Sequence, residues 1–288
     1  MEVIGTLLQK ATYLMEQSRT RGKEYKTSSV TLEELITSNV TSKCPFGMCD
    51  GSGLIYDPEV NTGTFCKCYE QHKLNNKLKF AQIPSEFQGY KIKDFNINIY
   101  NEKNKNAALI AKKAAIEFVN KFDEFQKGGK GLYFYSEIKG SGKTRLACSI
   151  GNALINMYFK NVRFITTINL LDKLKSTFDK NKTSESLTYD KLIQEIKNVE
   201  ILILDDIGVE VASEWAKEAF YSILNDRMTY KKVTIFTSNC KYEDLMYDER
   251  IIERIAKMAI PIKFPEQSIR SALAKKENEQ YIKMLVGE

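Results

Sequence analysis

Gly140-Ser141-Gly142-Lys143-Thr144 lies near the middle of the chain, shortly after the apolar run Gly131–Tyr135. An apolar strand that leads into glycines and then Lys-Thr is typical of a phosphate-binding loop, in which backbone N–H groups face phosphate oxygens. Lys143 would face the β- and γ-phosphates, and the Thr144 hydroxyl would face Mg²⁺. We therefore expect a site for ATP and Mg²⁺, with cofactor contacts from Gly140, Ser141, Gly142, Lys143, Thr144 and Arg145.

One position departs from the usual form of this loop, G-x-x-x-x-G-K-S/T. Its first glycine would fall at residue 137, where the chain has Glu137. The glycines nearest the phosphates are Gly140 and Gly142, whereas the first position mainly begins the turn. We expect the Glu137 carboxylate to point away from the nucleotide, and a helix from Arg145 to Met157 to direct its N-terminus at the anion.

A second motif is the apolar run Val199–Leu204, which ends in Asp205 and Asp206. A run of this length is typical of a strand buried on both faces. Two carboxylates at its end are costly unless they face a metal ion or water. We expect Asp205 to hold Mg²⁺ through its water shell and Asp206 to orient or deprotonate the attacking water. The alternative is that both residues cap the next helix.

A third strand is predicted at Val233–Thr237, and Ser238 and Asn239 follow it. The Asn239 amide, at a strand end beside the acidic pair, would position the water or sense the γ-phosphate. Taken alone, Thr-Ser-Asn is only a turn signal.

Strands and helices alternate after residue 107, where the apolar spacing predicts a helix over 107–125 that ends at 127–130. This order predicts an α/β fold with a parallel five-stranded sheet flanked by helices. The five expected strands are 131–135, 162–166, 200–204, 233–237 and 260–264.

Length and composition set limits on the protein class. A chain of 288 residues has room for two domains, and its net charge of +6 permits a polyanionic partner without requiring one. We place the boundary near residue 80, before Ile83-Pro84, which gives domains 1–80 and 81–288. No apolar run has the length of a membrane span, and no secretory segment is apparent at the N-terminus. We expect a soluble, cytoplasmic protein without membrane contact.

The N-terminal residues predict an amphipathic helix, which either packs on its own domain or offers its apolar stripe to a partner protein. The apolar positions at helical spacing are Ile4, Leu7, Leu8, Ala11 and Met15.

Four of the six cysteines cluster in sequence, at Cys44, Cys49, Cys66 and Cys68. In a reducing compartment, paired thiols favour metal ligation over disulfides, and four thiolates suit a structural Zn²⁺. Free or redox-active thiols are the alternative. His72 could replace one thiolate, although a histidine beside four cysteines is more often a bystander. Cys148 and Cys240 are interpreted as packing residues.

With these motifs assembled, the chain resembles the DnaC/DnaI family of replicative helicase loaders, which are AAA+ ATPases, and the related IstB transposition helpers. The paired cysteines are similar to the DnaI-type zinc domain. Ile83-Pro84, Tyr90 and Asp94-Phe95 are similar to the family's entry into its ATPase domain. Leu204–Gly208 is similar to its Walker B motif and Thr237–Asn239 to its sensor 1.

The resemblance implies two further roles for arginines. Arg250–Arg254 is similar to the family's box VII, which would make Arg254 the arginine finger that reaches a neighbouring subunit's nucleotide. Arg270 would be sensor 2. Lys143, Asp205, Asp206, Asn239, Arg254 and Arg270 then form the expected catalytic set, and activity would depend on self-association. Surface arginines on helices are the alternative for both.

The resemblance also implies a DNA contact and a reduced lid. Leu170–Lys197 occupies the place of the family's insertion that touches single-stranded DNA; Phe178, Lys180 and Lys182 suit stacking and phosphate contact, or belong to a solvated loop. After the last strand, only the predicted helical tail 267–287 remains.

The implied function is an ATP-dependent loader that places a DnaB-type replicative ring helicase onto single-stranded DNA. The N-terminal module would bind the helicase. Two alternatives are an IstB-like ATPase helper of transposition and a zinc adaptor that binds nucleotide without significant hydrolysis. The altered loop at Glu137 favours the adaptor, whereas a small-molecule kinase is disfavoured because a substrate lid is lacking.

Overall fold

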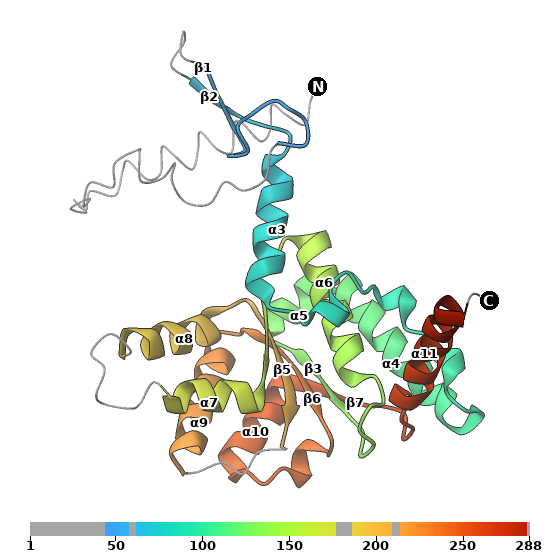
Figure 1. Ribbon diagram of the computed structural model, residues 1–288. Helices are drawn as coiled ribbons and strands as arrows, with labels where there is room; N and C mark the ends of the chain where they lie inside the picture. Colours follow the sequence, from blue (N-terminus) through green and yellow to red (C-terminus); the bar gives the residue numbers. More distant parts are fainter. Residues whose placement is uncertain (1–43, 58–61, 177–185, 209–213, 287–288) are drawn as a thin grey trace. The chain divides into compact units, whose positions relative to one another are not determined.

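The computed structural model describes residues 44–57, 62–176, 186–208 and 214–286, which divide into two compact units (Figure 1). The first ends at Tyr69 and the second begins at Glu70. The domain boundary near residue 80 stays a prediction. The expected N-terminal helix around Ile4–Met15, and Phe178, Lys180 and Lys182 of the expected DNA contact, lie outside the described residues.

The described part of the first unit contains a short antiparallel hairpin. Its strands are β1 (Leu54–Asp57) and β2 (Thr62–Phe65), and Leu54 pairs with Phe65. Ile55, between two exposed neighbours on β1, packs against the cysteine cluster. The alternation of side chains along a strand therefore turns one face of the hairpin toward the thiols.

The second unit is built on a parallel sheet with the strand order β4-β5-β6-β3-β7. The prediction of a five-stranded parallel sheet is confirmed. Central strands β3, β5 and β6 are almost wholly buried, as expected when helices cover both faces. The strand bounds are β3 Gly131–Tyr135, β4 Val162–Thr166, β5 Ile201–Ile207, β6 Val233–Ser238 and β7 Ala259–Lys263.

Two hydrophobic layers flank the sheet, because successive strand residues face opposite sides. Leu132 and Phe134 pack in the layer with α4 and α6, whereas Tyr133 packs in the layer with α7, α9 and α10 (Figure 1). The α-helices are α3 Tyr69–Ala81, α4 Glu102–Asn120, α5 Phe122–Gly128, α6 Lys143–Tyr158, α7 Thr167–Ser176, α8 Ser186–Asn198, α9 Glu214–Thr229, α10 Glu249–Met258 and α11 Arg270–Val286. Short 3-10 helices are η1 Ser85–Phe87, η2 Ile92–Asp94, η3 Ile97–Ile99 and η4 Tyr242–Asp244.

The single helix predicted over 107–125 is wrong: α4 and α5 are separate helices, divided at Lys121. Lys121 leaves helical geometry, with φ −108° and ψ 26°. Across the break, Phe122 and Phe125 of α5 both pack on Phe118 of α4, with ring centroids 5.8 Å and 4.9 Å from that of Phe118. The apolar spacing continues across the break, so periodicity alone predicts one helix.

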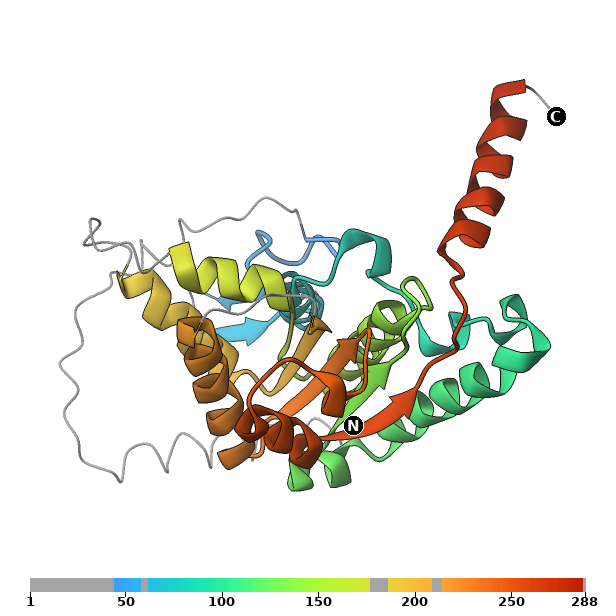
Figure 2. The ribbon, with the colours of Figure 1, turned by 90° about the horizontal axis from the view of Figure 1, so that it is seen from below.

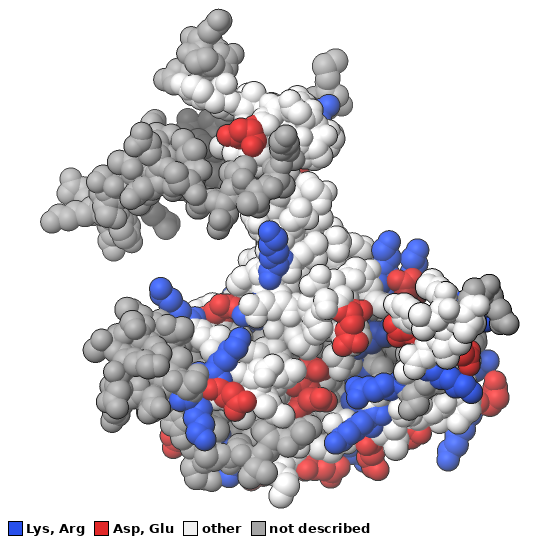
Figure 3. Space-filling model, viewed as in Figure 1, with Lys and Arg blue, Asp and Glu red and all other residues white. Residues whose placement is uncertain are grey.

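After β7, α11 is the last described element, and it extends away from the sheet in Figure 2. None of the described helices is long and apolar enough to cross a membrane. On the face of the second unit seen in Figure 3, basic and acidic side chains are intermixed, and no large area carries one sign alone.

Candidate nucleotide-binding site

The glycine-rich loop lies between the end of β3 and the start of α6. Gly140 and Gly142 have φ values of +74° and +96°, which L-residues with side chains rarely adopt. A Cβ on Gly142 would lie 3.0 Å from Tyr100 Oη, so the space is filled as well. Two hydrogen bonds fix the loop, from Tyr100 Oη to Ser141 O (2.7 Å) and from Ile269 N to Gly140 O (2.9 Å).

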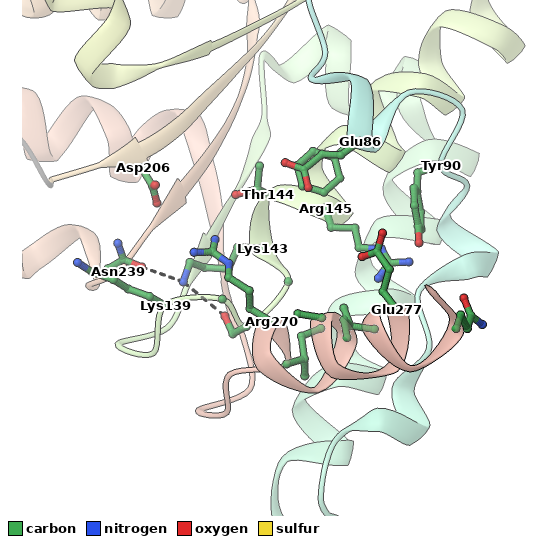
Figure 4. A pocket seen from close by; sticks show the side chains of 18 residues that line it. Glu86, Tyr90, Lys139, Lys143, Thr144, Arg145, Asp206, Asn239, Arg270 and Glu277 are labelled. Atoms are coloured by element: carbon green, nitrogen blue, oxygen red, sulfur yellow. Dashed lines mark hydrogen bonds between the residues drawn. The ribbon is translucent and has the colours of Figure 1, made fainter. Parts of the chain in front are cut away.

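Lys143 begins α6, and its ammonium group lies across the loop. It donates to Ser136 O, Ile138 O and Asn239 Oδ1 at 3.2, 3.2 and 3.1 Å (Figure 4). The residue is only 5% exposed, and this burial lowers the Lys143 pKa, which the nearby Asp206 carboxylate partly offsets. The phosphate-loop lysine and the strand-end amide are therefore in direct contact.

Glu137 is exposed, and it is not among the residues that line the pocket described below. The side chain therefore leaves the loop toward solvent, in the direction expected from its place at the start of the turn.

Asp205 lies on β5, two residues before the end of the strand, and is 5% exposed. Its Oδ1 accepts hydrogen bonds from Thr144 Oγ1 (2.8 Å) and Thr237 Oγ1 (2.6 Å), and its backbone carbonyl accepts from Thr167 Oγ1 (3.1 Å). Burial raises the Asp205 pKa to about 6, although the hydrogen bonds from Thr237 and Thr144 oppose the shift. Thr144 lines the pocket described below, and Asp205 does not. Together the hydroxyl and the carboxylate would supply oxygen ligands of the kind that Mg²⁺ prefers.

Asp206 lies next to it in an unusual backbone conformation, with φ +55°. The β5–β6 pairing shifts register between Leu204 and Ile207, and the Asp206 side chain lines the pocket (Figure 4). A left-handed conformation in a non-glycine residue is frequently found at functional sites.

A pocket of about 910 Å³ connects these groups, within the range of small-molecule sites. The phosphate loop, Asp206 and Asn239 form one end, while η1 and α11 form the other (Figure 4). Its lining residues are Glu86, Phe87, Tyr90, Lys139, Gly140, Ser141, Gly142, Lys143, Thr144, Arg145, Asp206, Asn239, Ile269, Arg270, Leu273, Ala274, Glu277 and Gln280.

Several lining residues were not expected from the motifs. The sequence places Tyr90 only at the entry to the second domain, yet the Arg145 guanidinium lies over its ring, 3.8 Å from the centroid. Arg145 Nε is buried without a hydrogen-bond partner. Glu86 and Glu277 also line this end. These residues are far from the phosphate loop in sequence, so no local motif predicts that they line the same pocket.

The two expected arginines lie in different places. Arg270 begins α11 and lines the pocket. Arg254 lies on α10, outside the lining of the pocket, and Nη2 donates to Tyr221 Oη (2.6 Å) and Asn225 Oδ1 (3.0 Å). The guanidinium also lies over the Tyr221 ring, 4.2 Å from its centroid. The chain's own pocket is therefore not reached by Arg254.

The four clustered cysteines converge in the first unit. The sulfur atoms of Cys44, Cys49, Cys66 and Cys68 all lie within 4.8 Å of one another. Tetrahedral Zn–S bonds of about 2.3 Å require sulfurs about 3.8 Å apart, so the set fits zinc. Burial opposes ionisation of Cys44, but backbone hydrogen bonds from Met48, Phe46 and Cys49 lower its pKa to about 6.

The other thiols and the histidine lie apart from this group. His72 is on α3 and is not one of the four converging residues. Cys148 is buried in the core, and Cys240 packs at the edge of the opposite layer.

Comparison with known proteins identifies the family. The model of the IstB-like ATP binding proteins matches residues 67–261. The chain belongs to this family. Its relatives include the replicative helicase loader DnaC of Buchnera aphidicola (subsp. Baizongia pistaciae), 32% identical over 162 residues, 56% of this chain and 61% of that protein. DnaC of Escherichia coli K12 is 30% identical over 143 residues, 49% and 55% of the two chains.

A solved structure agrees with these relatives. The crystal structure titled as DnaI matches with a TM-score of 0.50 and 31% identity, and covers 63% of this chain and 94% of that one. The chain spans less than two thirds of the length of these two curated relatives, 61% and 55%. The AAA+ fold and the resemblance to DnaC, DnaI and IstB proteins are confirmed, and this ATP-binding family supports ATP with Mg²⁺ as the ligand.

Proposed function

We propose that this protein is an ATP-dependent loader of a DnaB-type replicative ring helicase onto single-stranded DNA. The observation that carries the proposal is the convergence of Lys143, Thr144 and Asn239 at one end of a nucleotide-sized pocket, with Asp205 hydrogen-bonded to Thr144. The relatives named as helicase loaders support the choice of task. The roles of the individual site residues, and the binding of Mg²⁺ and Zn²⁺, are part of the same proposal.

The roles at the pocket follow from chemistry. Backbone N–H groups at the start of α6 and the Lys143 ammonium would bind the phosphates. Thr144 and Asp205 would hold Mg²⁺, which supplies charge stabilisation at the phosphoryl group when bound. Asp206 would orient the attacking water. Asn239 would give up its hydrogen bond with Lys143 and contact the γ-phosphate instead.

Beyond the pocket, Arg270 would contact phosphate from α11, and Arg254 would complete the site of a neighbouring subunit. Since the chain's own pocket is not lined by Arg254, a role for this residue in hydrolysis requires self-association. Hydrolysis would then depend on assembly. The cysteine cluster would hold a structural Zn²⁺ in the module that contacts the helicase.

The test is a loading reaction with the replicative helicase from the same organism and a circular single-stranded DNA. We expect the wild-type protein with MgATP to co-elute with the helicase and to increase the helicase retained on the circle. Asp206→Asn should bind ATP and the helicase yet fail to turn over ATP. Lack of a complex with the helicase in the presence of MgATP would contradict the proposal.

A second candidate is an ATPase helper of transposition, because the matching family model is that of the IstB-like proteins. The same chromatography with a transposase in place of the helicase distinguishes the two. Binding to the transposase alone would favour the helper. Binding to neither, with no ATP turnover, would favour a nucleotide-binding zinc adaptor.

A further inference from the structure

Thr237 is a fully buried residue near the end of β6, and its hydroxyl makes two hydrogen bonds at once. It donates to Asp205 Oδ1 across 2.6 Å. It also accepts from the backbone N–H of Asp206 across 3.0 Å. A threonine hydroxyl has one proton to donate and lone pairs that accept, so it can make both hydrogen bonds at once.

The second of these bonds replaces a missing backbone partner. β5 pairs regularly with β6 up to Leu204 and resumes at Ile207 opposite Ser238, with a register shift between. Within the shift, Asp206 adopts φ +55°, a conformation that costs about 1–2 kcal/mol for an L-residue. The Thr237 hydroxyl holds the Asp206 N–H at this irregularity, from which the side chain faces the pocket (Figure 4).

The neighbouring residues of β6 extend the connection. Ser238 Oγ donates to Ile207 O across 2.7 Å, which fixes the chain just after the acidic pair. Asn239 Oδ1, two residues beyond Thr237, accepts from Lys143 Nζ across 3.1 Å. One strand end therefore contacts the phosphate-loop lysine and both carboxylate residues.

We propose that Thr237 is a positioning residue for ATP hydrolysis, whose hydroxyl fixes the metal-side carboxylate Asp205 and the water-orienting Asp206 relative to Asn239. The inference rests on the proposed hydrolysis of ATP at this pocket. Thr237 is not among the residues that line the pocket, and its hydroxyl acts through the two acidic residues that it contacts. Small displacements of catalytic groups can lower a rate about 10²-fold, so the effect on turnover is large.

Two substitutions separate the hydroxyl from the shape of the side chain. Thr237→Val keeps the volume and removes both hydrogen bonds, whereas Thr237→Ser keeps the hydroxyl. Thr167→Val is the matched control: Thr167 is equally buried and bonds Asp205, but only at its backbone carbonyl. Thermal unfolding of each variant shows whether it is folded, and Thr237→Ala replaces the valine variant if that one is not.

The first measurement is ATP turnover. We expect Thr237→Val to lower kcat by about 10- to 100-fold while the KM for ATP changes less than about 3-fold. Thr237→Ser and Thr167→Val should stay within about 3-fold of wild-type kcat. A loss of equal size in Thr167→Val and Thr237→Val would overturn the proposal, because it would show a packing effect.

The second measurement does not require turnover. Mn²⁺ binding in the presence of a non-hydrolysable ATP analogue is followed by electron paramagnetic resonance. Loss of a residue that supports a metal ligand typically weakens metal binding about 10- to 100-fold, and we expect the lower end for Thr237→Val alone. If the wild-type protein binds Mn²⁺ and the analogue but does not hydrolyse ATP, the proposed function fails. The Mn²⁺ affinity of Thr237→Val then still tests whether Thr237 positions the metal-side carboxylate. Wild-type Mn²⁺ affinity in a folded Thr237→Val protein would refute the positioning role.

Discussion

The Thr144 hydroxyl at the start of α6 and the Asp205 carboxylate near the end of β5 are joined by a hydrogen bond of 2.8 Å. Thr144 belongs to a helix and Asp205 to a strand of the sheet, and two separate motifs predict these residues as Mg²⁺ ligands. Their contact places the two expected Mg²⁺ ligands side by side before any metal is bound. It also leaves a buried carboxylate whose contacts in the chain are with hydroxyl groups.

This burial predicts that Asp205 lowers the stability of the nucleotide-free protein. Its folded pKa is about 6, against an ordinary 3.8, so the folded state holds the proton more tightly than the unfolded state. The resulting stability is present below about pH 4 and is lost as the pH rises through 6. Asp205→Asn removes the charge and keeps an acceptor for both hydroxyls. We expect this variant to be more stable than wild type by up to about 3 kcal/mol at pH 8.

Urea unfolding in nucleotide-free buffer measures this difference, and it should shrink as the pH approaches 4. Addition of Mg²⁺ and nucleotide should stabilise the wild type more than the variant. If the variant is less stable than wild type at pH 8, burial of the ionised Asp205 carboxylate does not destabilise the folded protein, and the prediction is wrong.

Gly131 predicts a second effect on stability. A Cβ at this first residue of β3 would lie 1.8 Å from the backbone oxygen of Thr234 on the adjacent strand. Gly131→Ala must therefore push β3 and β6 apart, and we expect a loss of about 3 kcal/mol or more. Gly128→Ala is the control, since its nearest contact would be an ordinary 3.5 Å to Lys130. Thermal unfolding of the two variants should differ clearly; equal melting temperatures would contradict the strand packing.

The cysteine cluster predicts one Zn²⁺ per chain. Cys68→Ser should lose the metal, because three thiolates and a hydroxyl hold zinc less tightly than four thiolates. Cys240→Ser, which changes a thiol outside the cluster, should keep it. Elemental analysis of the purified proteins measures both. Wild-type protein that contains no zinc after purification without chelators would support the free-thiol alternative.

The position of Arg254 predicts complementation between subunits. Arg254→Ala should bind ATP normally and lose about 10³-fold or more in turnover, and Lys143→Ala should not bind ATP. A mixture of the two should recover activity, since one variant supplies an intact pocket and the other an intact arginine. Lys257→Ala, an exposed change one turn further along α10, should remain active. No recovery in the mixture, with both variants folded, would argue against a role in trans.

The parts of the site that follow a local pattern could be predicted from the sequence. Gly140–Thr144 follows a strand, Asp205 lies near the end of one, and Asn239 comes directly after another, so their chemistry and their common sheet edge follow from chain order. The contact of Arg145 with Tyr90 could not be predicted, because it depends on how η1 and η2 pack against α6. The two hydrogen bonds of Thr237 depend on a register shift that apolar spacing does not encode.

Titration calorimetry with MgATP tests the central claim most directly, namely that the loop before Thr144 binds a magnesium nucleotide despite Glu137. We predict saturable binding at about one site per wild-type chain and none for Lys143→Ala, whose ammonium would otherwise offset the phosphate charge. Folded wild-type protein that binds no MgATP would contradict the claim.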